Sequence, residues 1–363
     1  MSKRSLAAVG AVALSLLLAA CGSSSTPSSS SGGSSSSSAV AVGVILPDTA
    51  SSKRWENNDR PLLQSAFDAA GVKADIQNAQ GDKSKWSTLC DQFINEGVKV
   101  MVVVNLDSDT AKACETKAGA QGIKTIDYDR YTIGGSASYY VSFDNIGVGT
   151  LEGQGLVKCM QANGKSSGPV ALLNGSPTDN NATLFKQGYE AAIKSAGYTI
   201  AADQSVPEWN NTQGGVIFEQ MYTKAGGNFV GVDAANDGLG GAVVAVLQKN
   251  GLAGKVPVTG QDATNEGLQR VLLGTQCVTV YKAIKKEADA ASALAIALAT
   301  GAAPAGVADS TPYPGQIKPS VLLTPQAIYQ DNVKDVVADG FTTAADICTT
   351  PDLVAACAKY GVK

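Results

Sequence analysis

Histidine is absent from this chain of 363 residues. Histidine is the commonest general base in enzymes and the commonest side-chain ligand of transition metals, so its absence removes both of these roles. The net charge of −4 gives no basic surface of the kind that nucleic-acid binding requires. The composition therefore argues against a nucleic-acid partner and against most acid–base catalysis.

Motifs for nucleotide binding are missing as well. No Gly-x-Gly-x-x-Gly pattern follows an expected strand, and Gly147-Val148-Gly149 lies at the start of an expected helix. The chain has no Walker loop. Glycoside hydrolysis needs two carboxylates held at a set separation, and no pattern here predicts such a pair. We therefore expect a protein that binds a molecule without converting it, and not an enzyme.

Residues 1–20 have the organisation of an export signal. Lys3-Arg4 precede an apolar stretch from Leu6 to Leu18, which is too short to span a bilayer comfortably. The stretch Leu18-Ala19-Ala20-Cys21 resembles a bacterial lipobox, which predicts cleavage before Cys21 and acylation of its thiol. The alternative is an ordinary secretory signal with a chance cysteine.

Residues 21–38 form a linker that consists mostly of serine and glycine. Such a composition predicts a flexible tether, so the folded part should begin near Ala39. We expect the protein to be exported and held by its lipid at the outer face of the cytoplasmic membrane, in the cell envelope.

Six cysteines remain after Cys21, an even number that suits an oxidising compartment. Their spacing suggests the pairs Cys90–Cys114, Cys159–Cys277 and Cys348–Cys357. The first pair would join neighbouring helices in a sheet of order 2-1-3-4-5, the second follows by elimination, and the third flanks a short loop that contains proline. The alternative is free, buried thiols. No Cys-x-x-Cys arrangement favours a zinc site.

Past the tether, apolar runs alternate with helical patterns. The runs are rich in valine and isoleucine without polar alternation, as in strands buried on both faces of a parallel sheet. In the first half, strands are expected at 40–46, 73–78, 98–104 and 123–127, and helices at 55–70, 83–95 and 108–120, the last capped by Ser108 or Asp109. In the second half, strands are expected at 169–174, 199–206, 229–233, 256–260 and 277–281. The pattern predicts an α/β fold with two doubly wound (Rossmann-like) lobes.

The chain is expected to pass between the two lobes three times, which makes a hinge of several strands. The crossings are expected at 139–145, near Tyr281-Lys282 before an alanine-rich helix at about 283–300, and between about 312 and 323. The first lobe would comprise residues 39–143 plus about 283–312, and the second 144–282 plus about 313–363. Such connections permit a hinge closure around a ligand.

Polar side chains follow the expected strands, at the edge where α/β proteins bind ligands. Asp129 and Arg130 follow one strand, and Asp179 and Asn181 follow another. Asp179 could serve only as a helix N-cap, and Asp129-Arg130 only as a surface ion pair. An asparagine amide both donates and accepts, as sugar hydroxyls do, which favours contact with a sugar.

Further candidates lie after later strands and near the hinge. Asn236 and Asp262 can reach the same cleft, whereas Asp237 is expected to cap the next helix. Arg54 and Lys282, each taken alone, are expected to be solvated. Trp55 and Trp209 lie in expected cleft turns, and Trp86, in mid-helix, is expected to pack in the core.

The charges of these candidates narrow the ligand class. Three cations, Arg54, Arg130 and Lys282, balance three carboxylates, Asp129, Asp179 and Asp262. A phosphate or carboxylate ligand would call for a surplus of positive groups. The balance therefore favours a neutral polyol.

At these residues the chain resembles the sugar-binding lipoproteins of ABC importers, which have the type I periplasmic-binding fold. The resemblance covers most of residues 40–300 and is carried by Lys53-Arg54-Trp55, Tyr128-Asp129-Arg130, Val141 to Asn145, Gly175 to Phe185, Ala235-Asn236-Asp237, Gly260 to Ala263 and Thr279 to Lys282. It implies that the ligand is a pentose, D-xylose, and that Trp55 and Trp209 form aromatic walls around it. The residues that the resemblance implies as hydrogen-bond partners of the sugar are Arg54, Asp129, Arg130, Asp179, Asn181, Asn236, Asp262 and Lys282. The tether, the six cysteines and the tail beyond about 325 depart from soluble members.

The function expected from this resemblance is the capture of a monosaccharide by a monomer that delivers it to an ABC permease. Two alternatives remain open: a sugar receptor that signals to a chemoreceptor or histidine kinase, and an envelope enzyme that acts on sugars. A transcription regulator of the same fold is not expected, because the N-terminus offers an export signal in place of a DNA-binding module.

Overall fold

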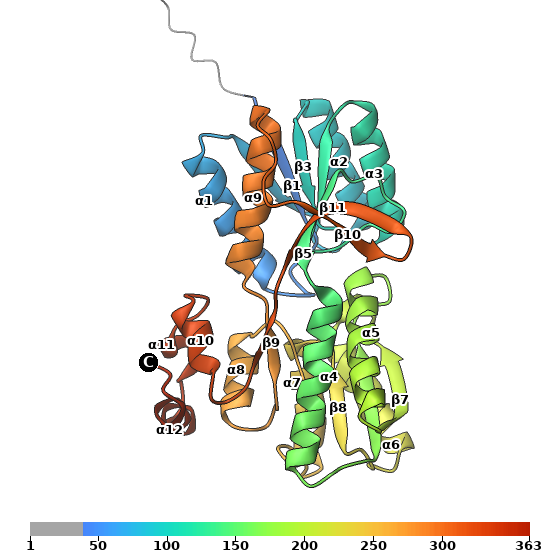
Figure 1. The fold of residues 1–363 in the computed structure, drawn as a ribbon, viewed down its shortest axis with the longest axis vertical. Helices are drawn as coiled ribbons and strands as arrows, with labels where there is room; N and C mark the ends of the chain where they lie inside the picture. Colours follow the sequence, from blue (N-terminus) through green and yellow to red (C-terminus); the bar gives the residue numbers. More distant parts are fainter. Residues whose placement is uncertain (1–38) are drawn as a thin grey trace, which may run out of the picture. The chain divides into compact units, whose positions relative to one another are not determined.

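The computed structural model describes residues 39–363 (Figure 1). The export signal expected at 1–20, the acylated Cys21 and the tether all lie outside the described residues. In the part of the chain that the structure describes, no helix has the length and apolar character needed to cross a membrane.

The first lobe is built on a seven-stranded sheet. Its strands are β1 (Val42–Leu46), β2 (Ala74–Asn78), β3 (Val100–Val103), β4 (Lys124–Tyr128), β5 (Tyr139–Phe143), β10 (Ala308–Tyr313) and β11 (Gln316–Leu323). Their order is β10-β11-β5-β4-β3-β1-β2, and only the β10–β11 pair is antiparallel. The expected order 2-1-3-4-5 and the doubly wound fold are confirmed.

Helices cover both faces of this sheet (Figure 1). The helices of the first lobe are η1 (Trp55–Asp59), α1 (Arg60–Ala69), α2 (Lys83–Glu96), α3 (Ser108–Ala120) and α9 (Ile284–Thr300). Alternate side chains of β1 enter different cores: Val44 packs with α1 and α9, whereas Ile45 packs with α2 and α3. The cap predicted for α3 is wrong, because Asp107 accepts the Thr110 N–H.

The second lobe repeats the pattern. Its elements are α4 (Asn145–Ala162), β6 (Pro169–Asn174), α5 (Asn180–Ser195), β7 (Thr199–Ser205), η2 (Pro207–Trp209), α6 (Asn211–Lys224), β8 (Gly231–Ala234), α7 (Asp237–Lys249), α8 (Asn265–Leu272), β9 (Thr279–Tyr281) and β12 (Gln326–Ile328). The strand predicted at 256–260 is wrong. It is reduced to two isolated bridges, of Val258 with Val232 and of Val256 with Ala253, and Pro257 between them has no N–H with which to extend the ladder.

Three connections link the lobes. The chain passes from β5 to α4, from β9 to α9, and from β11 to β12 (Figure 1). Because β11 pairs with β5 through Ser320–Leu323, the third crossing follows Leu323. The boundary expected at about 312–313 is therefore too early, since β11 belongs to the first lobe.

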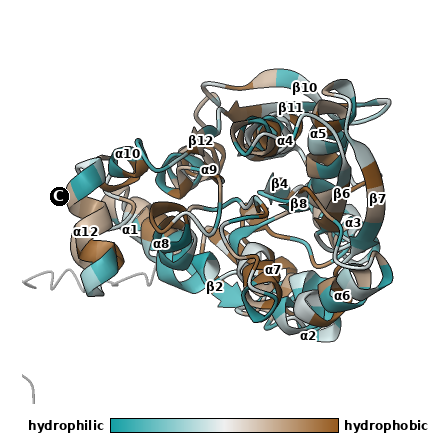
Figure 2. Cartoon of the chain, turned by 90° about the horizontal axis from the view of Figure 1, so that it is seen from below, coloured by the Kyte–Doolittle hydropathy of each residue, from teal (hydrophilic) through white to brown (hydrophobic). Residues whose placement is uncertain are grey.

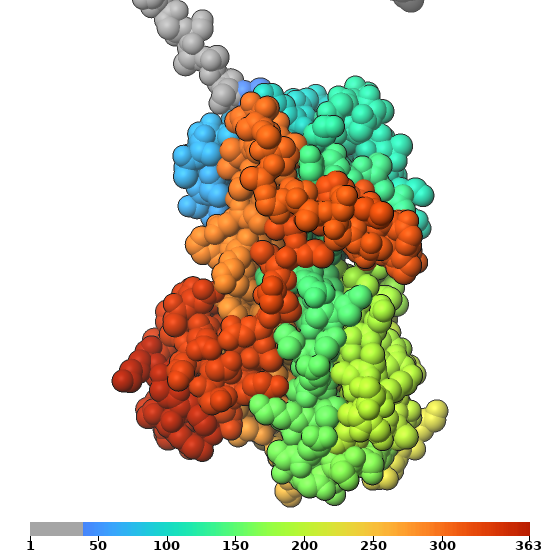
Figure 3. All heavy atoms as spheres, in the orientation of Figure 1, coloured from blue at the N-terminus to red at the C-terminus, as the bar shows by residue number. Residues whose placement is uncertain are grey.

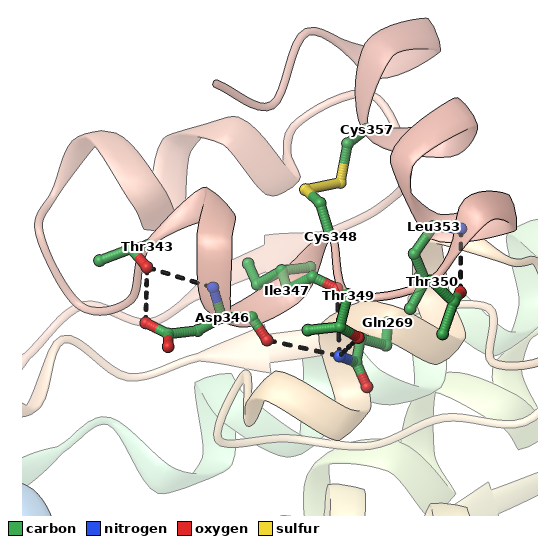
Figure 4. The surroundings of a disulfide bond; sticks show 9 residues. All are labelled: Gln269, Thr343, Asp346, Ile347, Cys348, Thr349, Thr350, Leu353 and Cys357. Carbon is green, nitrogen blue, oxygen red and sulfur yellow. Dashed lines mark hydrogen bonds between the residues drawn. A yellow bond between two sulfur atoms is a disulfide. The ribbon is translucent and has the colours of Figure 1, made fainter.

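The six cysteines are paired as their spacing suggests: Cys90–Cys114 joins α2 to α3, and the other bridges are Cys159–Cys277 and Cys348–Cys357. The loop expected between the last two cysteines is wrong. Pro351 begins helix α12 (Pro351–Tyr360), and Thr350 accepts the Leu353 N–H (Figure 4). Proline suits the first position of a helix, where its missing N–H costs nothing.

The tail packs on the second lobe. It comprises α10 (Val333–Ala338), α11 (Ala344–Ile347) and α12. Helix α8, on which the tail packs, carries both hydrophobic (brown) and hydrophilic (teal) residues (Figure 2). Leu268 and Leu272 of α8 share one hydrophobic cluster with Ile347 and Leu353. Figure 3 shows this red C-terminal segment packed beside the second lobe.

Helices α4 and α5 cross at unusually short range because glycine lies at the crossing. A Cβ added to Gly149 would lie 1.9 Å from the Phe185 carbonyl oxygen, and one added to Gly188 would lie 2.4 Å from the Ile146 oxygen. No side chain fits these positions unless the helices separate.

We predict that Gly149→Ala lowers the free energy of unfolding by about 1–3 kcal/mol, because it overpacks this crossing. The matched control is Gly119→Ala in α3, where no described atom lies within 4 Å of the added Cβ. The control should stabilise by about 0.5–1 kcal/mol, since glycine is costly inside a helix. Urea unfolding of both variants measures the difference, and equal values would contradict the close crossing.

Candidate functional site

A small cavity of about 40 Å³ lies between the two lobes. Because most of the side chains that line it are buried, we call it the enclosed cavity. Its lining includes every side chain that the sequence predicts as a ligand contact: Arg54, Trp55, Asp129, Arg130, Asp179, Asn181, Trp209, Asn236, Asp262 and Lys282. The sequence missed four more lining residues, Ser51, Ser52, Phe185 and Gln261. Of these, Phe185 and Gln261 lie inside the stretches that carry the family resemblance, so the resemblance could have identified them.

Arg54 is the most heavily engaged charged side chain of the site. Its guanidinium donates to Asp59 at 2.7 and 2.9 Å, to Asp129 at 2.8 Å and to Glu287 at 2.5 Å. Burial opposes the charge of Arg54, but the three carboxylates outweigh it and raise its pKa. The solvated position expected for Arg54 is wrong, since the residue is 6% exposed.

The first-lobe carboxylate Asp129 points into the cleft from a strained turn after β4. Its φ of 62° is in the left-handed region, which is uncommon for a residue other than glycine. The backbone oxygen of Asp129 is held by hydroxyl groups of Tyr140 at 3.1 Å and Ser142 at 2.8 Å. Burial disfavours its charge, yet Arg54, Lys282 and Arg130 together hold the pKa of Asp129 below its ordinary value.

The two lobes meet directly at this site. Asn181, at the start of α5, donates to the Asp129 backbone oxygen at 2.9 Å and to its carboxylate at 3.2 Å. Arg130 Nε lies 3.2 Å from Asp179 Oδ2. First-lobe residues 129 and 130 thus pair with second-lobe residues 179 and 181, and the structure has its cleft closed.

Asp179 is the N-cap of α5 and also lines the cavity. One carboxylate oxygen accepts the Asn181 N–H at 2.9 Å, which caps α5. The other accepts the Trp209 indole N–H at 3.1 Å and faces Arg130. Burial raises the pKa of Asp179 in spite of Arg130, so the charged form of this carboxyl group is costly to keep in the closed cleft.

Asp262 and Lys282 form the second-lobe ion pair, at 3.0 Å. Asp262 has a φ of 89°, which again marks a strained turn beside the cleft. Lys282 is buried, so its expected solvation is wrong. Burial lowers its pKa, but Asp262 and Asp129 more than compensate and leave the pKa above its ordinary value.

The cap predicted for α7 is wrong, since Asn236 takes that place. Asn236 accepts the Leu239 N–H at 2.8 Å through its side-chain oxygen, and its amide remains able to donate into the cavity. Asp237 is buried beside it and accepts from Gln276 at 2.7 Å and from the Thr264 N–H at 2.8 Å. Burial raises the pKa of Asp237 to about 6.

Aromatic rings close the cavity on both sides. The Arg54 guanidinium lies 4.5 Å from the centre of the Trp55 ring, and Phe185 meets Trp209 edge to face at 6.4 Å. A Cβ at Gly175 would lie 2.0 Å from the Trp209 ring, so glycine is required there for the ring to fit. Trp86, as expected, is a core residue, and its indole donates to the Val104 oxygen at 2.9 Å.

The charge balance predicted from six residues holds only in part. Asp59 and Glu287 add two carboxylates that contact Arg54. Burial raises the pKa of Glu287 to about 8, against the influence of Arg54. These two groups bring the carboxyl groups to five, against three cations. The site has no surplus of positive charge and still favours a neutral ligand.

Two more carboxyl groups are buried in the second lobe, outside the cavity lining. Glu152 of α4 and Asp233 of β8 are both fully buried, and none of their four side-chain oxygens has a hydrogen-bond partner among the described residues. Burial raises the pKa of both groups, and Asp233 adds to the shift of Glu152. Among the described residues no group of three or more cysteine or acidic side chains is placed to hold a metal ion.

These raised pKa values make a prediction about stability. The folded protein keeps protons on Glu152 and Asp233 that the unfolded chain has already released, so folding stability falls as pH rises from about 4.5 through the folded pKa values. Glu152→Gln removes one titrating group and can donate to Asp233, so it should raise the free energy of unfolding at pH 8 by about 1–3 kcal/mol.

Urea unfolding at pH 5 and pH 8 measures this effect. The control is Glu219→Gln, a change at an exposed residue of α6 that should leave the pH dependence as in the parent protein. A Glu152→Gln protein that is no more stable than the parent at pH 8 would show that the buried carboxyl groups find partners.

The fold and the site together define a two-lobed protein that closes around a small polar ligand, and comparison with known proteins agrees. Residues 42–303 match the family described as "Periplasmic binding protein domain". The chain is 33% identical over 314 residues to the D-xylose-binding periplasmic protein of Escherichia coli (strain K12), with 85% of this chain and 92% of the relative covered. It is 32% identical to the D-xylose-binding periplasmic protein of Haemophilus influenzae, with 83% and 90% covered.

A solved structure supports the same conclusion. The carbohydrate transporter solute-binding protein of Chloroflexus aurantiacus, in complex with D-glucose, aligns with a TM-score of 0.75 and 26% identity, covering 85% of this chain and 98% of that one. The chain belongs to the periplasmic binding protein family.

Proposed function

We propose that this protein is the solute-binding component of an ABC sugar importer, and that it captures a monosaccharide, D-xylose, in the cavity between its lobes. One observation carries the proposal. The cavity brings polar side chains of both lobes into direct contact, with Asp129 and Arg130 on one side and Asp179 and Asn181 on the other.

The chemistry of these groups supports a sugar. A hydroxyl group both donates and accepts, so it can lie between a carboxylate and a guanidinium that contact each other when no sugar is bound. Each such charge-assisted hydrogen bond contributes about 1.5–3 kcal/mol. The rings of Trp55 and Trp209 line the cavity and can pack on the C–H faces of a pentose.

The proposed mechanism is capture and release by a hinge motion. Opening would break the contacts of Arg130 with Asp179 and of Asn181 with Asp129, and closing on a sugar would replace them with ligand contacts. We propose no catalytic step. The carboxylates that line the cavity, Asp129, Asp179 and Asp262, are each engaged by a cation.

The binding test is calorimetric titration of the purified protein with D-xylose. Asp179→Ala should weaken binding by about 2–3 kcal/mol, or roughly 30- to 150-fold, because it leaves buried Arg130 and the Trp209 N–H without their acceptor. The control is Asp309→Ala on β10, where the residue is exposed. D-Xylose affinity that survives Asp179→Ala unchanged would put the sugar elsewhere, and a parent protein that binds no pentose or hexose would refute the proposal.

We further propose that the protein acts as an exported monomer, anchored by a lipid on Cys21, and delivers its sugar to a membrane permease. The motif Leu18-Ala19-Ala20-Cys21 and the serine-rich linker support this location. Cys21→Ser should release the protein from the membrane fraction into the detergent-free supernatant. The matched control is Ser23→Ala, which leaves the lipobox intact. Equal membrane association of both variants would exclude the lipid anchor.

A further inference from the structure

A second, larger cavity opens beside the first. It measures about 620 Å³ and is open to solvent at the entrance of the cleft, and we call it the entrance groove. Its lining comes from three parts of the chain: residues 49–54, 57, 58 and 284 of the first lobe; 211, 236–238, 262, 264–266 and 270 of the second lobe; and 341, 342 and 346 of the tail. A volume of this size is that of an ordinary small-molecule site.

The entrance groove adjoins the enclosed cavity. Five residues line both spaces, namely Ser51, Ser52, Arg54, Asn236 and Asp262. A group attached to a sugar in the enclosed cavity would therefore have to pass only these shared side chains to reach the groove.

The groove walls carry groups that suit hydroxyls. Neutral amides and hydroxyls are contributed by Asn57, Asn58, Asn211, Asn265, Thr264 and Thr342. Phe341 adds an aromatic ring, which is held by an edge-to-face contact with Tyr281 at 5.2 Å. This combination of amides, hydroxyls and one ring is the same kind of surface that lines the enclosed cavity.

The charges of the groove argue against an anionic ligand. Its cations are Lys53, Arg54 and Arg270, and its acidic residues are Asp237, Asp262, Glu266 and Asp346. Lys53 and Glu266 come from opposite lobes and pair across the groove at 3.4 Å, with both side chains largely exposed. Since no positive charge is left over, the groove does not favour a sugar phosphate.

The tail holds its part of the wall in place by fixed contacts. Thr342 donates to Asn265 at 2.7 Å. Gln269 donates to the Ile347 oxygen at 3.1 Å and to Thr349 at 3.2 Å, and the Cys348–Cys357 disulfide closes the segment that directly follows (Figure 4). These contacts anchor the tail on α8, so the groove is already formed in the closed protein and its occupant has little ordering cost to overcome.

We propose that the entrance groove is a second subsite, which binds a further sugar unit or another neutral substituent linked to the sugar in the enclosed cavity. The ligand class is thus extended from free monosaccharides to neutral glycosides and short oligosaccharides. The proposal rests on the proposed function, because the first sugar unit occupies the enclosed cavity.

The test compares D-xylose, the two methyl D-xylopyranosides and xylobiose as calorimetric ligands of the whole protein. We expect xylobiose or a methyl xyloside to bind within about tenfold of D-xylose, and native mass spectrometry should show the intact ligand in the complex. Phe341→Ala and, separately, Asn57→Ala with Asn58→Ala should weaken xylobiose about five- to tenfold and D-xylose less than twofold. Asn228→Ala, at an exposed residue outside both cavities, is the control.

The outcomes separate this proposal from the proposed function. If D-xylose binds and no substituted ligand does, the second subsite is refuted and the proposed function stands. Xylobiose affinity that none of the groove variants changes also refutes the subsite. If no sugar binds at all, the proposed function fails and the subsite fails with it. The Asn57/Asn58 variant keeps the test decisive if Phe341→Ala does not fold, since both asparagines reach the groove from η1 and leave the tail untouched.

Discussion

The cluster around Arg54 is the constraint on which the first-lobe half of the site depends. One guanidinium is shared by Asp59, Asp129 and Glu287, which lie in η1, after β4 and in α9. A buried ion cluster of this kind contributes little net stability, because desolvation offsets the attraction, but loss of one member leaves charges buried without a partner. Tyr128 also donates to Asp59 at 2.5 Å. The cluster therefore specifies where Asp129 lies and how far the helices can shift around it.

The second lobe fixes the positions of its cavity side chains mainly through backbone conformation. Asp262 and Trp209 both have positive φ values, of 89° and 55°, as Asp129 does in the first lobe at 62°. Each of these residues is held by neighbouring hydrogen bonds: the Asp262 N–H donates to the Val280 oxygen, and the Trp209 indole donates to Asp179. Strain that persists at functional side chains shows that the surrounding fold overrides local preference there. Both lobes thus present rigid polar groups, and the motion is left to the three connections.

The sequence predicts the fold well because buried parallel strands leave an unmistakable pattern of valine and isoleucine runs. It fails where a single residue interrupts that pattern, as Pro257 does, and where an edge hairpin such as β10–β11 has no such run. Site residues were found because they follow strands or match a family. Asp59, Glu287, Glu152 and Asp233 were missed, because each lies inside a helix or strand and acquires its role only from distant partners. Periodicity carries no information about such contacts, and neither does it show that Arg54 and Lys282 are buried.

The positions of the three disulfides relative to the two cavities bear on how the protein can be produced. None of the six paired cysteines lines the enclosed cavity or the entrance groove. Cys348–Cys357, however, closes a segment that directly follows the tail residues of the groove wall, Phe341, Thr342 and Asp346. A chain that folds in a reducing cytoplasm can therefore assemble its inner site from the same side chains while its tail lacks this covalent closure. The redox state of the folding compartment then decides whether the segment next to the entrance is covalently closed, so protein from two expression routes with identical sequences can differ at this place.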